Sequence, residues 1–174
     1  MEQQFSPSRS RATSKPHVVC PPVLFYECGC CKNLFQQLTG WKIAPPQCCN
    51  QKMSLLEVVS PQMVKNEVKL DYKIMGGYNE NVVVVEWEIQ VEDLAVKWIY
   101  LKTFTGGMIK YVDNLQKKSF RFALADEDSY VYCDEDPCLE CTFRCKRGFE
   151  IYILLTGNKL VKLPLDKMTA NWHS

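Results

Sequence analysis

The stretch YECGCCKNLFQQLTGWKIAPPQCCNQKM, residues 26–53, holds five of the ten cysteines in this chain of 174 residues. Cys28 and Cys31 form a Cys-x-x-Cys turn, and after sixteen intervening residues the adjacent pair Cys48 and Cys49 follows. A Cys-x-x-Cys turn lets two thiolates converge on one ion, while nearby backbone N–H groups donate to the sulfurs. Together, four thiolates would close a tetrahedral site, so the spacing predicts a metal knuckle with these four ligands.

The residues around the second pair are suited to a sharp bend. Pro45 and Pro46 restrict the chain before the pair, and Asn50 after it tolerates a left-handed turn. Tyr26, Met53 and Leu55 bracket the cysteines. We therefore expect them to form the small apolar core of the knuckle.

Composition and the N-terminal residues favour metal ligands over disulfides. Hydrophobic residues make up 47% and charged residues 24%, and the net charge of +1 gives no global basic field for nucleic acid. The opening MEQQFSPSRSRATSKP is polar, without the apolar stretch of a secretory signal, and no apolar run is long enough to span a bilayer. We therefore expect a nuclear or cytoplasmic protein that is not secreted and makes no membrane contact, in a compartment that keeps thiols reduced.

The rest of the chain has strand patterns. Apolar residues alternate in EVKLDYKI, residues 67–74, and in NVVVVEWEIQV, residues 81–91, and further short runs follow at 95–104, 108–112, 119–124, 129–133 and 149–155. The run LLTGNKLVKL, residues 154–163, is typical of a hairpin closed by Gly-Asn. Strands at this spacing predict an all-β protein with an antiparallel β-sandwich.

The domain organisation follows from these patterns. Residues 1–19 have the composition of a disordered tail. We expect the metal knuckle over residues 20–57, the sandwich over residues 62–165 and a C-terminal tail over residues 166–174.

The knuckle resembles a known family. The aromatic residue before the Cys-x-x-Cys turn, the spacer, the Cys-Cys pair and the following Met are similar to the desulforedoxin knuckle, a zinc-ribbon-like module that also begins the desulfoferrodoxins. The resemblance covers residues 26–56 and implies Cys28, Cys31, Cys48 and Cys49 as the ligands. Cys30 departs from the pattern, because it places an extra thiol inside the turn; a shifted register that uses Cys30 is the alternative.

Desulfoferrodoxins continue into an immunoglobulin-like sandwich that reduces superoxide at an iron held by four histidines and a cysteine. The resemblance implies such a sandwich here. This chain has only two histidines, His17 and His173, near its two ends. From this shortage we expect a protein that is not an enzyme. The expected cofactor is structural Zn²⁺, one or two per chain, with iron as the alternative.

A second cysteine cluster lies in CDEDPCLECTFRC, residues 133–145. Its thiols are candidates for a second metal site, and they are Cys133, Cys138, Cys141 and Cys145. Alternatively, Cys138 and Cys141 share one zinc with the first Cys-x-x-Cys turn, as in the β-tent proteins, or the cluster holds no metal.

The leading functional hypothesis is a zinc-stabilised interaction module or adaptor with a protein partner, for which Trp41 and Trp172 are candidate contacts. One alternative is a nucleic-acid-binding zinc protein, because basic and aromatic residues alternate over 101–122. Another is an iron-thiolate electron-transfer protein related to desulfoferrodoxin. No motif identifies a small-molecule substrate or a catalytic residue.

Overall fold

The computed structural model describes residues 22–38, 44–75, 81–113, 116–129, 131 and 146–165. In these residues the chain is all-β, with three short 3-10 turns, which confirms the predicted fold class. No helix in the described part of the chain is long and apolar enough to cross a membrane. The strands are β1 (Leu24–Glu27), β2 (Leu34–Gln37), β3 (Gln47–Cys48), β4 (Gln51–Lys52), β5 (Ser54–Leu55), β6 (Val58–Val59), β7 (Val68–Met75), β8 (Val82–Ile89), β9 (Val96–Lys102), β10 (Gly107–Tyr111), β11 (Ser119–Ala123), β12 (Glu150–Leu155) and β13 (Leu160–Pro164).

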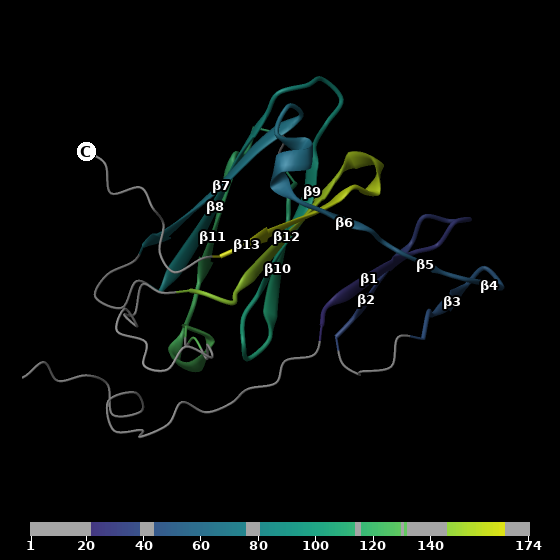
Figure 1. Cartoon of the computed structure of the whole chain (residues 1–174), viewed down its shortest axis with the longest axis horizontal. Helices are drawn as coiled ribbons and strands as arrows, with labels where there is room; N and C mark the ends of the chain where they lie inside the picture. Colours follow the sequence, from purple (N-terminus) through teal and green to yellow (C-terminus); the bar gives the residue numbers. More distant parts are fainter. Residues whose placement is uncertain are drawn as a thin grey trace, which may run out of the picture.

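Two sheets form the sandwich (Figure 1). One has the strand order β10-β9-β12-β13-β6, and the other has the order β11-β8-β7. Every pairing in them is antiparallel except the short parallel pairing of β13 with β6. The main core includes Val83, Val85 and Trp87 of β8 together with Ile99 and Leu101 of β9. These residues alternate along their strands, so one face of each sheet supplies the core.

The predicted hairpin over residues 154–163 is confirmed. Strands β12 and β13 pair in antiparallel register, and the turn η3 (Thr156–Asn158) joins them. Gly157 and Asn158 both have positive φ, 74° and 56°, which glycine and asparagine adopt at little cost. The strand predicted over 129–133 is not seen where the chain is described, because Ser129 ends the turn η2 (Asp126–Ser129) and most of that run lies outside the described residues.

The five-stranded sheet is apolar on both faces. On β9, Ile99 and Leu101 point into the main core, while Trp98 and Tyr100 point to the opposite face, yet all four are buried. An apolar outer face needs a cover, because exposed aromatic surface is unfavourable in water. The N-terminal unit provides it.

The N-terminal unit consists of the sheet β2-β1-β5 and the hairpin β3-β4 (Figure 1). Because side chains alternate along a strand, Phe25 and Tyr26 of β1 point to opposite faces of this sheet. Phe25 packs on the outer face of the sandwich, with its ring 5.3 Å from that of Trp98 and 5.4 Å from that of Tyr152. Tyr26 packs against Cys28 and Met53. Strand β1 therefore joins the cysteine cluster to the sandwich.

Candidate metal centre

Four cysteine sulfurs meet at one end of the N-terminal unit. The Sγ atoms of Cys28, Cys31, Cys48 and Cys49 all lie within 4.8 Å of one another. The Sγ atoms of Cys31 and Cys48 are 3.5 Å apart, and those of Cys48 and Cys49 are 3.9 Å apart. The structure thus brings together the four cysteines singled out by their spacing.

The first pair is positioned by a tight turn after β1. The N–H of Lys32 donates to the carbonyl of Cys28 at 3.0 Å, and the N–H of Cys28 donates to the carbonyl of Asn33 at 2.9 Å. Lys32 has a φ of 61°, which reverses the chain direction. The backbone N–H groups of Cys31 and Cys30 point to the buried sulfur of Cys28. These hydrogen bonds favour the thiolate and lower the pKa of the Cys28 thiol to about 6.

The second pair is positioned by a two-residue hairpin loop. Cys48 pairs with Gln51 across strands β3 and β4. The two loop residues, Cys49 and Asn50, have φ values of 49° and 58°, as a type I′ turn requires. The left-handed turn expected at Asn50 is therefore present. It places the sulfurs of Cys48 and Cys49 on the same side of the hairpin.

The knuckle's apolar core differs in one residue from the prediction. Tyr26 and Met53 are buried beside Cys28, as predicted. Leu55 was expected to join them, and this is wrong, because 48% of Leu55 is exposed. Tyr26 is in register with Leu55 on one side and Phe35 on the other, so the outer strands β5 and β2 carry these flanking side chains to the edge of the sheet.

Hydrogen bonds among the thiols also shift the pKa values of Cys48 and Cys49. Contacts with the thiol of Cys31 and then with that of Cys28 raise the pKa of Cys48. Contacts with the thiol of Cys31, and then with those of the other cysteines, raise the pKa of Cys49 to about 12. Of the thiols of Cys28, Cys48 and Cys49, that of Cys28 is therefore the one that ionises most readily. A metal ion that takes all four thiolates must displace the protons of the remaining thiols, so binding is coupled to proton release.

The donor set fits a tetrahedral metal ion. With metal–sulfur distances of about 2.3 Å, a regular tetrahedron has sulfur–sulfur edges of about 3.8 Å. Two of the sulfur–sulfur distances, 3.5 and 3.9 Å, are close to this edge, and all of them lie within 4.8 Å. Four thiolates are typical ligands of iron and zinc. The cluster could therefore hold one such ion.

Gln51 is a neighbour of the cluster that the sequence did not reveal. Its side-chain Nε2 lies 3.9 Å from the Sγ of Cys28, at the length limit of a weak N–H···S contact. Cross-strand pairing with Cys48 brings it there. Only a prediction of the hairpin register could have identified it.

Most of the other predicted site residues are not among the residues that the structure describes. The second cluster (Cys133, Cys138, Cys141 and Cys145) and the candidate contacts Trp41 and Trp172 lie outside the described residues, as do His17 and His173. Cys30 is exposed and is not part of the four-sulfur group. Trp87 and Trp98 are both buried.

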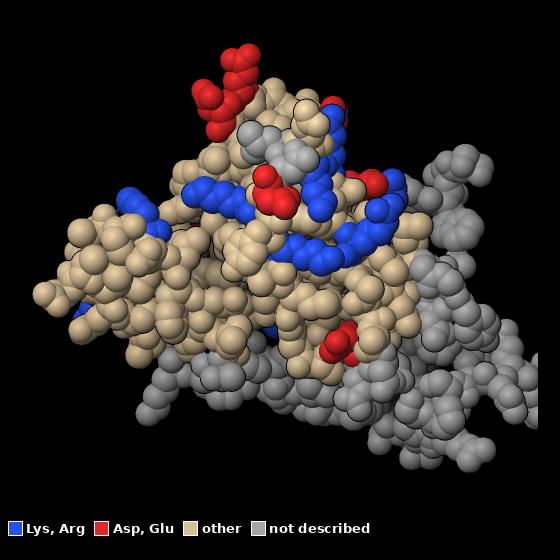
Figure 2. All heavy atoms as spheres, turned by 180° about the vertical axis from the view of Figure 1, so that it is seen from behind, with Lys and Arg blue, Asp and Glu red and all other residues tan. Residues whose placement is uncertain are grey.

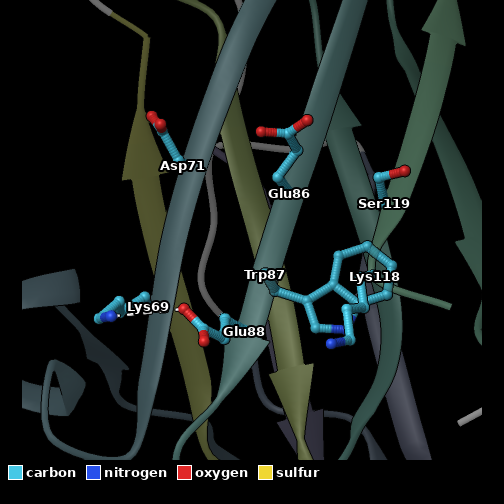
Figure 3. A pocket seen from close by; sticks show the side chains of 7 residues that line it. All are labelled: Lys69, Asp71, Glu86, Trp87, Glu88, Lys118 and Ser119. Atoms are coloured by element: carbon cyan, nitrogen blue, oxygen red, sulfur yellow. Dashed lines mark hydrogen bonds and ion pairs between the residues drawn. The ribbon is translucent and has the colours of Figure 1, made fainter. Parts of the chain in front are cut away.

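An open hollow on the outer face of the three-stranded sheet is a weaker candidate (Figure 3). Charged side chains line it, and they are largely partnered across the strands. Lys69 pairs with Glu88 at 3.3 Å, and Glu86 pairs with Lys73 at 2.7 Å. These ion pairs are typical of a solvated sheet face.

Several of the basic residues over 101–122 contact aromatic or acidic side chains in the described part of the chain. Lys117 lies 4.1 Å from the ring centroid of Phe120, and Lys110 lies 5.3 Å from that of Phe122. Lys102 pairs with Glu150. On the face seen in Figure 2, basic side chains form a short arc with acidic side chains beside it.

Comparisons with known proteins add one finding. No protein-family model matches the sequence, and no curated protein matches it. Among solved structures, the superoxide reductase from Treponema pallidum is similar, with a TM-score of 0.51 and 14% sequence identity over 82% of this chain and 97% of that chain. This likeness shows a shared fold and agrees with the sandwich that the resemblance implied.

The comparison corrects one expectation. We expected a protein that is not an enzyme, and the similarity to an enzyme contradicts this. The expectation rested on the shortage of histidines. Histidines are not the only route to electron chemistry, because a cluster of four thiolates can also bind a redox-active ion.

Proposed function

We propose that the protein is an iron-thiolate redox protein, in which Cys28, Cys31, Cys48 and Cys49 hold one iron ion. The observation that carries the proposal is the convergence of four sulfurs within 4.8 Å. When bound, the iron supplies a one-electron couple. The superoxide reductase fold supports iron over zinc, because zinc has no redox chemistry.

The exposure of the cluster also supports electron transfer. Cys28 is buried, but Cys31 and Cys49 are exposed. Exposed ligand sulfurs shorten the path to a redox partner. Phe35 and Leu55, 47% and 48% exposed, lie on the same face of the sheet as Tyr26, which packs against Cys28. Such an apolar surface suits a small, transient contact with a protein partner.

The experiment is anaerobic reconstitution of the reduced protein with ferrous iron. We expect a full equivalent of bound iron, visible charge-transfer bands of ferric thiolate after oxidation, and their reversible loss on reduction. The Cys49→Ser variant should lose these bands. The Cys30→Ser variant is the matched control and should keep them.

Two results together would contradict the proposal. The protein purified from iron-supplemented cells would contain only zinc, and it would show no reversible bands after reconstitution with iron. Superoxide consumption is measured on the same samples. A rate that is lost in Cys49→Ser and kept in Cys30→Ser would assign that activity to the four-cysteine centre.

A further inference from the structure

Tyr152 lies at the centre of an aromatic cluster between the N-terminal unit and the sandwich. It is 4% exposed and points to the outer face of the five-stranded sheet. Its ring centroid is 5.4 Å from that of Phe25 and 6.3 Å from that of Tyr100. Phe25 in turn lies 5.3 Å from Trp98. Three oxidisable rings, those of Tyr152, Tyr100 and Trp98, therefore surround one phenylalanine.

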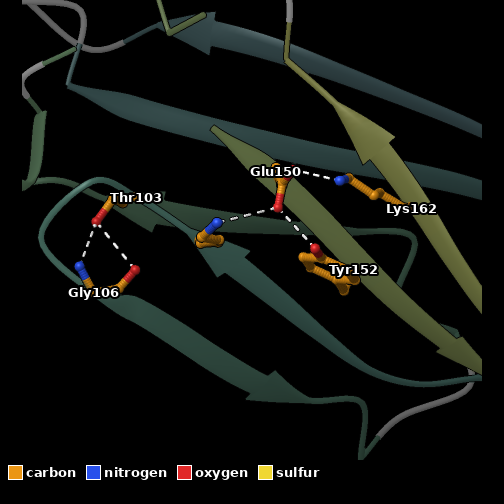
Figure 4. Close-up of polar contacts among 6 residues, drawn as sticks. Thr103, Gly106, Glu150, Tyr152 and Lys162 are labelled. Carbon is orange, nitrogen blue, oxygen red and sulfur yellow. Dashed lines mark hydrogen bonds and ion pairs between the residues drawn. The ribbon is translucent and has the colours of Figure 1, made fainter. Parts of the chain in front are cut away.

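The hydroxyl of Tyr152 has a defined proton acceptor (Figure 4). It donates a hydrogen bond of 2.7 Å to the Oε2 of Glu150, two residues earlier on the same strand. Two lysines hold this carboxylate in place. Lys102 lies 3.5 Å from the same oxygen, and Lys162 pairs with Oε1.

The surroundings favour an ionised carboxylate and a neutral phenol. Burial alone would raise the pKa of Glu150, but hydrogen bonds from Lys162 and Tyr152 and the charge of Lys102 outweigh it and lower that pKa. Burial and the hydrogen bond to Glu150 raise the pKa of Tyr152. At neutral pH the pair is therefore a phenol that donates to a carboxylate. A phenol that has lost an electron is a strong acid, so the proton then moves to this carboxylate.

The cluster also reaches the surface. Tyr111 of β10 is in register with Trp98 of β9, so the two side chains share the outer face. Tyr111 is 68% exposed, whereas Trp98 is buried. Oxidisable side chains therefore extend from solvent at Tyr111 to the buried Tyr152–Glu150 pair.

We propose that Tyr152 is a redox-active tyrosine, with Glu150 as its proton acceptor, which gives one electron to oxygen-centred radicals of the peroxyl class. In the step, the Tyr152 phenol loses one electron and its hydroxyl proton moves to Glu150, leaving a neutral phenoxyl radical and a neutral carboxyl group. The peroxyl radical gains the electron and takes a proton from solvent, which gives a hydroperoxide. This activity goes beyond the proposed function, because it needs no iron in the four-cysteine centre.

The test is flash photolysis of the full-length, zinc-loaded protein with an external ruthenium oxidant. Zinc is used because it is redox-inactive, so failure of the iron proposal leaves the test unaffected. The expected signal is the narrow visible absorption band and the electron paramagnetic resonance spectrum of a neutral tyrosyl radical. Tyr152→Phe should abolish most of this signal, whereas Tyr72→Phe on the other sheet should leave it unchanged.

Glu150→Gln provides the second variant, because it keeps the size of the side chain and removes the base. We expect the radical to form about 100-fold more slowly in this variant, since a positioned base contributes rate factors of roughly this size. The solvent deuterium isotope effect on the slow step should change as well. An unchanged rate in Glu150→Gln would overturn the proposal, as would an undiminished radical yield in Tyr152→Phe. Oxidation with a water-soluble source of peroxyl radicals should place the wild type and the variants in the same order of tyrosyl radical yield.

Discussion

Single residues decide which thiols can act as ligands. Cys30 and Cys31 are neighbours and both exposed, but only Cys31 joins the four-sulfur group. The sequence left two registers open, because spacing does not reveal the direction of a side chain. In the turn after β1, the backbone N–H of Cys30 points to the sulfur of Cys28, and the group of four sulfurs that lie within 4.8 Å of one another includes Cys31.

A residue-scale prediction concerns pH and Glu150. Its pKa is lowered below the ordinary value of 4.5, so the ionised group stabilises the fold above pH 4.5, and this contribution is lost as the pH falls through the lowered pKa. We expect the free energy of unfolding of the wild type to exceed that of Glu150→Gln at neutral pH, and this difference to shrink in acid. Urea unfolding of both proteins across that range measures it. A difference that stays constant with pH would contradict the assignment.

A second residue-scale prediction concerns Asn50. Its φ of 58° lies in the left-handed region, where a β-branched side chain costs about 1–2 kcal/mol. Asn50→Val should therefore lower stability by this amount and weaken metal binding, because the turn positions Cys49. Asn50→Gly, the matched control, should bind metal like the wild type. Competition with a chromophoric chelator gives both affinities, and equal values for Val and Gly would show that the turn does not position the ligand.

At the scale of the strands, β10 depends on a glycine that lets Tyr100 lie across it. A Cβ added at Gly107 would come within 2.1 Å of the Tyr100 hydroxyl, whereas one added at Gly106 would meet nothing within 4 Å. We expect Gly107→Ala to destabilise the fold by about 1–3 kcal/mol, the usual cost of overpacking. Gly106→Ala should have little effect. Thermal unfolding compares them, and equal transitions would mean that Tyr100 moves aside without cost.

The strands also show how far sequence patterns can be used. The alternation in NVVVVEWEIQV correctly predicted that Val83, Val85 and Trp87 of β8 face the core. It did not predict that Val84, on the opposite face, is buried as well. In AVKWIYLKTF both faces are apolar, which indicates a cover on each side but not what provides it. The predicted burial of Leu55 was wrong for a related reason. Burial of a strand residue depends on whether its strand lies at the edge of a sheet, and the apolar character of Leu55 does not reveal that β5 is an edge strand.

At the scale of the whole molecule, the cysteine spacing predicted which four cysteines lie together, and the strand patterns predicted the sandwich. Neither predicted that the two parts share a core. That core forms because Phe25 inserts among Trp98, Tyr100 and Tyr152, residues far from it in sequence. Long-range packing of this kind leaves no local pattern.

This shared core leads to a prediction about metal binding and global stability. Phe25 is 3% exposed, so Phe25→Ala should cost about 3–5 kcal/mol, the usual cost of removing a buried aromatic ring. It should also separate the knuckle from the sandwich. In the wild type, metal bound by the knuckle stabilises every residue that unfolds with it. We therefore expect metal to slow hydrogen exchange in β9, which contains no cysteine, and to lose this effect in Phe25→Ala.

The matched control is Phe35→Ala, because Phe35 lies on the same small sheet but is 47% exposed and does not contact the sandwich cluster. It should keep the effect of metal on β9. Hydrogen exchange measured by mass spectrometry, with and without chelator, compares the three proteins. If metal protects β9 equally in Phe25→Ala and the wild type, the ring is not the link. The coupling would then run through β6, which follows the knuckle and pairs with β13 at the opposite side of the sheet.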